Sequence, residues 1–177
     1  MENYKEKQLS TKRIFTGKIM NVNLDEVEIA DGKKSTREYI EHSGGVVIAA
    51  KRNDGKILLV SQYRYAIRQM IYELPAGKLE KYEDPFLAAK RELEEETGYI
   101  ASKWEDLGYI QTSPGILNEK LYLYKASELS YKGQKLDDGE FLNCFALEEK
   151  EILEKIKSGE INDAKTICGI MRAFILW

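Results

Sequence analysis

The sequence predicts an α/β fold in which helices pack on a mixed β-sheet. Three observations carry this prediction: short apolar runs bounded by turn residues, a well-capped amphipathic helix near the middle of the chain, and two helical segments at its end. Strands interleaved with helices are typical of layered α/β folds. At 177 residues the chain has the size of one domain, or of one domain with a small accessory piece.

The N-terminal part of the chain is predicted to form a separate antiparallel β arm. Its strands are expected at residues 13–15, 20–29 and 35–40. Asp31-Gly32 supplies a turn before the last of them, and Ser43-Gly44-Gly45 then interrupts the pattern. We therefore divide the chain into an arm, residues 1–42, and a main domain, residues 43–177.

The main domain is predicted to open with two buried strands. Residues 46–50 and 56–63 are nearly all apolar, as in strands that are covered on both faces. A helix is expected from Pro85 to Thr97, because Asp84 is a good N-cap and Gly98 a good C-terminal stop. The other expected elements are strands at 71–74, 104–110, 121–125 and 141–146 and helices at 148–157 and 164–176.

The composition excludes several classes of protein. The chain is 43% hydrophobic and 32% charged, which indicates a folded protein. A net charge of −3 lacks the basic excess of a broad nucleic-acid surface, and one histidine with two scattered cysteines argues against zinc. Cys144 and Cys168 are interpreted as free thiols in a reducing compartment. No secretory signal or membrane span is recognised, so a cytoplasmic location is expected.

The helix at 85–97 places carboxylates where a structural helix would bury apolar groups. Phe86, Ala89 and Leu93 form one apolar stripe, and the next position on that stripe is Glu96. Glu92 lies one turn earlier. These charges crowd the negative end of the helix dipole, and a single arginine, Arg91, is too little to neutralise them. A divalent cation with oxygen ligands, Mg²⁺ or Mn²⁺, would do so, although a solvated acidic face is the alternative from these residues alone.

The spacing of this segment resembles the signature of the Nudix hydrolases. Gly77, Glu83, the run Arg91-Glu92-Leu93-x-Glu95-Glu96 and Gly98 stand at the positions of that pattern, and only Tyr99 departs from it. The resemblance implies an α/β/α sandwich that presents a metal site to a diphosphate. It implies metal ligation by Glu92, Glu96 and the carbonyl of Ala76. It also implies a catalytic or ligating role for Glu95, and bracing of the loop by Glu83 and Arg91.

The flanking segments resemble the ADP-ribose pyrophosphatases of this family. The similar pieces are Gln62-Tyr63-Arg64, Glu73-Leu74-Pro75-Ala76-Gly77 and Thr112-Ser113-Pro114-Gly115. This resemblance implies metal-dependent hydrolysis of ADP-ribose to AMP and ribose 5-phosphate. The loop around Glu140 is similar to the acidic loop that carries a last metal ligand or the catalytic base, and Asp138 is the alternative base.

The same resemblance implies a homodimer whose arms cross to the partner chain and help to bind substrate. The implied substrate-binding residues are Arg37, Glu38, Arg64, Ser113, Pro114, Gly115 and Glu119. His42 is a further candidate, and Phe15 and Tyr63 either stack on adenine or pack in the core.

Three other functions are compatible with parts of the sequence. The chain could hydrolyse nucleotide sugars or other nucleoside diphosphate derivatives at the same metal site. A non-catalytic metabolite-binding module would be expected to lose glutamates of the signature, and all are present. An RNA-end processing factor is disfavoured because the chain has no basic stripe.

Overall fold

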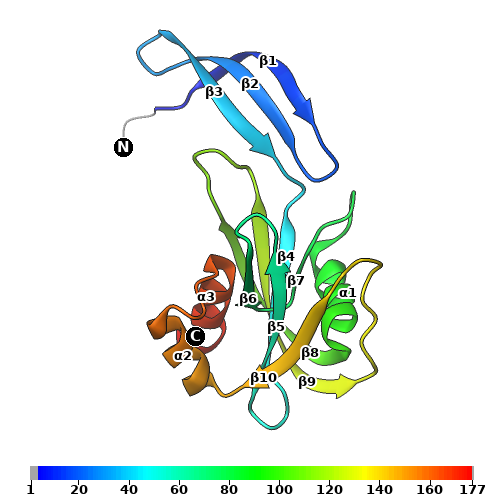
Figure 1. Cartoon of the computed structure of the whole chain (residues 1–177). Coiled ribbons are helices and arrows are strands. Elements are labelled where there is room, and N and C mark those ends of the chain that lie inside the picture. Colours follow the sequence, from blue (N-terminus) through cyan, green and yellow to red (C-terminus); the bar gives the residue numbers. More distant parts are fainter. Residues whose placement is uncertain (1–3, 177) are drawn as a thin grey trace. The chain divides into compact units, whose positions relative to one another are not determined.

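The computed structural model describes residues 4–176 and divides the chain into two compact units. The first unit extends to Ser43 and also includes Gln111–Glu119, and the second comprises Gly44–Ile110 and the chain from Lys120 onward. The two units are described separately below, with the element labels of Figure 1.

The first unit is a three-stranded antiparallel sheet. It contains β1 (Lys7–Thr16), β2 (Asn21–Glu28) and β3 (Lys34–Glu41), in the order β1-β2-β3. β1 is longer than the predicted 13–15. Its pairing with β2 runs from Lys7 to Thr16 and continues past two register shifts, one between Gln8 and Ser10 and one between Arg13 and Phe15. Ile40 forms a parallel bridge with Leu117, which ties the segment 111–119 to this sheet.

The second unit contains two sheets. The mixed sheet has the order β7-β4-β9-β8, in which β4 runs parallel to β9 and antiparallel to β7. The antiparallel sheet has the order β10-β5-β6. The bounds of these strands are β4 (Gly45–Ala50), β5 (Ile57–Arg64), β6 (Gln69–Glu73), β7 (Ala76–Lys78), β8 (Tyr99–Gln111), β9 (Lys120–Tyr131) and β10 (Leu142–Leu147).

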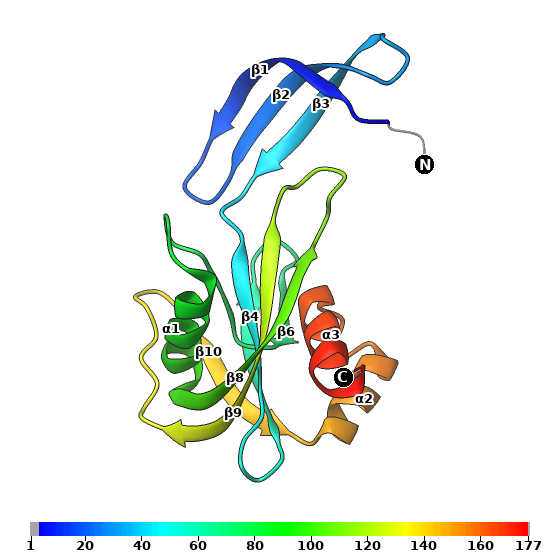
Figure 2. The ribbon, with the colours of Figure 1, turned by 180° about the vertical axis from the view of Figure 1, so that it is seen from behind.

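Helices cover the sheets of the second unit on opposite sides. α1 (Pro85–Thr97) lies on one side, and α2 (Glu149–Ser158) and α3 (Ala164–Ile170) lie on the other (Figures 1 and 2). β4 is fully buried between them: Val46 and Ile48 pack in the core that includes α1, and Val47 packs in the core of α2 and α3. The predicted α/β/α layers around a mixed sheet are therefore confirmed.

The predicted bounds of α1 are confirmed by its caps. The Asp84 carboxylate accepts hydrogen bonds from the N–H groups of Phe86 and Leu87, at 3.0 and 3.1 Å. Gly98 ends the helix in the left-handed region, with φ 75°, where glycine carries no steric penalty. No helix among residues 4–176 is long and apolar enough to cross a membrane.

β8 and β9 extend beyond the predicted 104–110 and 121–125, and two other elements differ from the prediction in kind. β7 was missed because its three residues, Ala-Gly-Lys, carry no strand signal, and it forms only through pairing with β4. The last predicted helix, 164–176, changes at Met171 into a π-helical turn that ends at Ile175.

Candidate active site

The acidic face of α1 is buried within the second unit. Leu93 and Ala89 are fully buried, as the apolar stripe predicts. Glu92 and Glu96 continue this face, and they are only 9% and 4% exposed. The sequence thus places two carboxylates in a core position, where charge is costly unless it is compensated.

Gly77 makes room for the carboxylate of Glu92. A β-carbon at position 77 would lie 1.8 Å from Cδ of Glu92, which is inside the carboxylate itself. No side chain larger than hydrogen fits there without displacing Glu92. The first glycine of the signature is therefore a steric requirement of the acidic site.

Ala76 lies beside the second buried carboxylate. Its backbone N–H donates a hydrogen bond to Oε2 of Glu96 at 2.9 Å. The preceding residue is held as well, because the carbonyl of Pro75 accepts from the N–H of Ile48 at 2.8 Å. The structure thus places Ala76 beside Glu96.

Arg91 forms ion pairs with three of the acidic residues. It pairs with Glu83 at 2.9 Å, with Glu92 at 2.8 Å and with Glu95 at 2.9 Å. Its two contacts to Glu83 fasten the loop before α1 to the helix, which agrees with the expected bracing role. The helix places Arg91 within reach of both Glu92 and Glu95, while Glu96 has no ion pair in the described part of the chain.

Burial raises the pKa of both inner carboxyl groups. The pKa of Glu92 rises to about 7, mainly through desolvation, and the charges of Glu95 and Glu140 add to the rise while Arg91 opposes it. The pKa of Glu96 rises to about 8 through desolvation, with further contributions from the charges of Glu92 and Glu140. Glu140 therefore lies within electrostatic range of both inner carboxylates, although its own side chain is exposed.

The inner carboxylates fit a divalent cation. One oxygen of Glu92 accepts from Arg91 and one oxygen of Glu96 accepts from Ala76, which leaves the other oxygen of each without a donor in the described part of the chain. All-oxygen ligands suit Mg²⁺ or Mn²⁺. Among residues 4–176, however, no three His, Cys, Asp or Glu side chains are gathered closely enough to hold an ion as they stand.

The loop that leads to Glu140 is anchored on the C-terminal end of α1. The carbonyl of Glu95 accepts from the N–H of Lys135 at 3.1 Å, and the carbonyl of Glu96 accepts from the Gln134 amide at 2.5 Å. A β-carbon at Gly98 would lie 2.6 Å from the backbone nitrogen of Gln134. The last glycine of the signature therefore makes room for this loop and also ends the helix.

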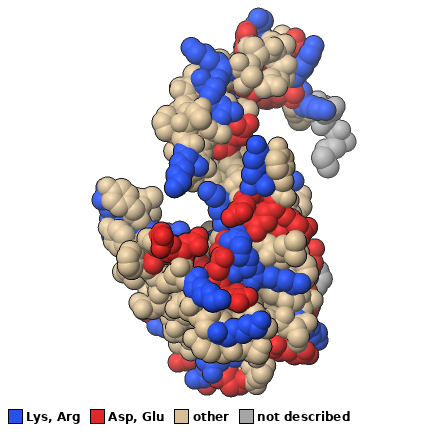
Figure 3. Space-filling model, turned by 90° about the vertical axis from the view of Figure 1, so that its right-hand side faces the viewer, with Lys and Arg blue, Asp and Glu red and all other residues tan. Residues whose placement is uncertain are grey.

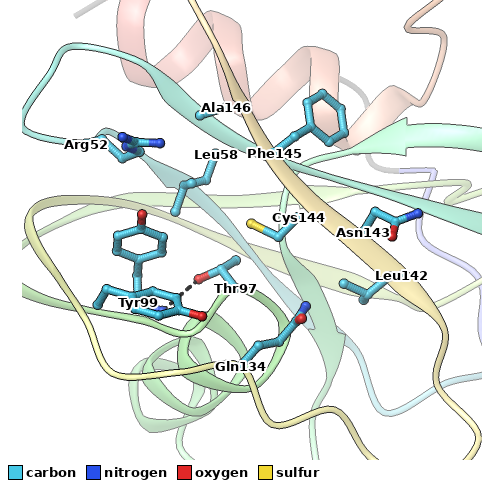
Figure 4. A pocket seen from close by; sticks show the side chains of 11 residues that line it. Arg52, Leu58, Thr97, Tyr99, Gln134, Leu142, Asn143, Cys144, Phe145 and Ala146 are labelled. Carbon is cyan, nitrogen blue, oxygen red and sulfur yellow. Dashed lines mark hydrogen bonds between the residues drawn. The ribbon is translucent and has the colours of Figure 1, made fainter.

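A cavity of about 340 Å³ lies next to this anchor. Figure 4 shows Gln134 and Thr97 on one side of it and Cys144 of β10 on another. Burial raises the pKa of the Cys144 thiol to about 11, so this thiol stays protonated and unreactive near neutral pH.

The structure gathers the predicted site residues in two sets, one in each unit. The second unit holds Arg64, Ala76, Arg91, Glu92, Glu95, Glu96 and Glu140. The first unit holds Arg37, Glu38, Ser113, Pro114, Gly115 and Glu119.

Within the first unit, two of the predicted substrate-binding residues, Arg37 and Glu119, already have side-chain partners. Arg37 pairs with Glu6 at 2.5 Å, and this hydrogen bond raises the pKa of the guanidinium. Glu119 accepts from the Thr112 hydroxyl at 2.7 Å and lies 3.2 Å from Nδ1 of His42. The arm strand and the segment 111–119 are thus joined around Glu119.

Two residues of the second unit that fix the positions of other groups near the acidic site were not predicted from the sequence. Gln134 anchors the loop before Glu140, and Lys165 of α3 binds the buried carboxylate of Glu73. Neither stands in a recognisable pattern. Glu73 belongs to a segment that the sequence analysis noted, but its burial and its ion pairs depend on the packing of α3.

Acidic and basic side chains are interspersed on the face of the molecule that includes α1 (Figure 3). Neither sign covers this face. It offers no continuous basic surface of the kind that binds a nucleic-acid backbone.

A layered α/β/α unit with a buried acidic helix, braced by an arginine, defines a Nudix-type hydrolase. The family models agree: the NUDIX domain matches residues 41–168, and the nucleoside diphosphate sugar hydrolase N-terminal domain matches residues 6–40. The chain belongs to the Nudix hydrolases, so the predicted family is confirmed.

Individual relatives cover nearly the whole chain. The methanol dehydrogenase activator of Bacillus methanolicus is 43% identical over 94% of this chain and 91% of its own length. The ADP-ribose pyrophosphatase of Bacillus subtilis (strain 168) is 40% identical over 96% and 93%, respectively. A crystal structure of an ADP compounds hydrolase matches 97% of this chain and 94% of its own, with a TM-score of 0.85; at 19% identity it supports the fold alone.

Proposed function

We propose that this chain is a metal-dependent pyrophosphohydrolase that cleaves ADP-ribose to AMP and ribose 5-phosphate. The observation that carries the proposal is the pair of buried carboxylates, Glu92 and Glu96, on a helix inside the segment that matches the NUDIX domain. The choice of ADP-ribose is supported by the 40% identical ADP-ribose pyrophosphatase, which aligns over nearly the full length of both chains.

The proposed metal ligands are Glu92, Glu96, the carbonyl of Ala76 and Glu140. Nudix hydrolases generally depend on a divalent cation, and Mg²⁺ is the expected ion, with Mn²⁺ as a substitute. When bound, the ion neutralises negative charge on the diphosphate and lowers the pKa of nearby water. Glu92 and Glu96 would then be ionised, because the cation favours the charged form of a neighbouring carboxyl.

Glu140 is proposed to accept the proton of the attacking water. Water adds to one phosphorus, the bridging P–O bond breaks, and the proton goes to the carboxylate. The electrostatic influence of Glu140 on both inner carboxylates supports its place at the site. Asp138 and Glu95 are the alternative bases. Arg91 is proposed to act by holding Glu83 and Glu95 in position.

We further propose that the active species is a homodimer in which Arg37, Glu38, Ser113–Gly115 and Glu119 contribute to substrate binding. The arm supports this because its three strands are marginal alone, and Ile14 and Phe15 on β1 are 53% and 52% exposed. A partner chain would cover such a surface.

A panel of nucleoside diphosphate derivatives tests the proposal. The purified chain is incubated with ADP-ribose, GDP-mannose, UDP-glucose and ATP in Mg²⁺, and the products are separated by chromatography. We expect AMP and ribose 5-phosphate, at the highest kcat/KM of the panel. Faster cleavage of a nucleotide sugar would support the alternative substrate class. Equal hydrolysis of ATP would contradict the substrate assignment.

A second candidate function comes from the methanol dehydrogenase activator, whose identity to this chain is 43%. The chain would then also raise the activity of a methanol dehydrogenase. Adding the chain, and separately its Glu92→Gln variant, to that dehydrogenase tests this candidate. An increase in the dehydrogenase rate that requires Glu92 would support it.

A further inference from the structure

A buried ion cluster connects the C-terminal helix with the edge of the acidic site. Glu73, at the end of β6, is 1% exposed. Its carboxylate accepts two hydrogen bonds from Arg64, at 2.8 Å from Nε and 3.0 Å from Nη2. This two-pronged contact fixes the plane and the direction of the guanidinium.

Arg64 lies within electrostatic range of the acidic site. Its side chain is 42% exposed, and its charge acts on the carboxyl group of Glu96. A guanidinium held beside the inner carboxylates is suited to bind a diphosphate oxygen.

Lys165 of α3 supplies a second positive charge to the same carboxylate. Its ammonium group pairs with Glu73 and, at 3.0 Å, with Asp163. The lysine side chain is 15% exposed, so these contacts form in a poorly solvated place. Glu73 is thus held from two sides, by Arg64 and by Lys165. Because Asp163 balances the charge of Lys165, the lysine acts by fixing the position of Glu73, which in turn fixes the guanidinium of Arg64.

We propose that Lys165 is a positioning residue of the diphosphate subsite, acting through Glu73 on Arg64. The proposal rests on the proposed function, because it takes Arg64 to contact the diphosphate. It assigns the C-terminal helix a part in substrate binding that no motif of the sequence indicates.

The docking of α3 does not by itself explain a buried lysine. The hydroxyl of Thr166, which is fully buried, accepts from the N–H of Leu74 at 2.8 Å and already joins α3 to the end of β6. Gly169 and Ile170 pack the same helix into the core. Since burying a charged pair costs desolvation free energy, an apolar residue at position 165 would have served packing as well.

The experiment compares Lys165→Met and Lys165→Arg with a matched control, Lys157→Met. Lys157 lies on α2, where it makes an exposed ion pair with Glu154 in which both side chains are more than 60% exposed. Four quantities are measured for each variant: kcat and KM for ADP-ribose, the dissociation constant of inorganic pyrophosphate in the presence of Mg²⁺ by calorimetry, and the melting temperature.

For Lys165→Met we expect KM and the pyrophosphate dissociation constant to rise together by about tenfold or more, as for the loss of a charge-assisted contact, with kcat changed less than about threefold. Lys165→Arg should recover most of this loss, and Lys157→Met should resemble the unmodified chain. The proposal is overturned if pyrophosphate binds Lys165→Met normally, or if kcat falls while KM stays unchanged.

Pyrophosphate binding separates this proposal from the proposed substrate. A chain that binds pyrophosphate in a Lys165-dependent way but does not cleave ADP-ribose refutes the substrate and keeps the role of Lys165. If Lys165→Met does not fold, the double variant Glu73→Gln/Lys165→Met removes the buried charge of Glu73 together with that of Lys165 and frees Arg64 from its fixed position. Pyrophosphate should then bind about tenfold more weakly, and unchanged binding overturns the proposal.

Discussion

Replacing Glu96 by glutamine should stabilise the metal-free protein, by an amount that grows with pH. The pKa of Glu96 is 4.5 in the unfolded chain and about 8 in the folded one. A carboxyl group whose folded pKa is raised contributes stability below the unfolded pKa, and this contribution is lost as the pH rises through the folded pKa. The metal-free protein should therefore lose stability between about pH 5 and pH 8.

The size of the effect follows from the two pKa values. At about 1.4 kcal/mol per pKa unit, their difference corresponds to roughly 5 kcal/mol once Glu96 is ionised in both states. Glutamine cannot ionise, and its oxygen can still accept from the N–H of Ala76. Its amide group needs a new partner, which costs about 1 kcal/mol or more. We expect a net gain on the order of 3 kcal/mol at pH 9 and little gain at pH 5.

Urea unfolding followed by circular dichroism measures this gain. Both chains are unfolded with a chelator at pH 5, 7 and 9, and then with Mg²⁺ at pH 7. Mg²⁺ should stabilise the unmodified chain much more than Glu96→Gln. Glu94→Gln, on the same helix but partly exposed, is the control and should change little. If the difference between the unmodified chain and Glu96→Gln is the same at pH 5 and pH 9, the reasoning from burial is refuted.

Three further predictions concern other parts of the site. Gly77→Ala should lower kcat by about a hundredfold, because its β-carbon displaces the carboxylate of Glu92; activity near that of the unmodified chain would show that the site tolerates the shift. Glu140→Gln should lower kcat by at least about a hundredfold with KM for ADP-ribose little changed, whereas Asp138→Asn should do much less; the reverse order would move the base to Asp138. Light scattering should give a dimer at micromolar concentration, and Phe15→Glu should shift it toward a monomer; a fully active monomer would exclude the proposed role of the arm.

The main elements and α1 could be predicted from sequence because their signals are local. The bounds of α1 depend on Asp84, Pro85 and Gly98, which act within one turn of the helix. The burial of β4 on both faces follows from an unbroken apolar run. β7 could not be predicted, because a three-residue strand forms only when β4 lies beside it.

The residues of the candidate site likewise fall into those that local sequence predicts and those that depend on packing. The glutamates of α1 could be located from their spacing, since residues three and four apart share one helix face. The contacts of Arg91 with Glu83 and Glu92 depend on side-chain direction, so counting charges along the sequence underestimated them. Gln134 and Lys165 act across segments far apart in the chain, and no local pattern marks them.

The structure also explains why the signature contains its first and last glycines. Gly77 is required by the carboxylate of Glu92, and Gly98 by the backbone of the loop that leads to Glu140. The signature therefore fixes more than a row of ligands on a helix. It also fixes two close approaches: that of β7 to the side chain of Glu92, and that of the loop after β9 to the C-terminal end of α1. A glutamate row on a helix without both glycines would keep its charge but lose these approaches, which is why the spacing is more informative than the acidity.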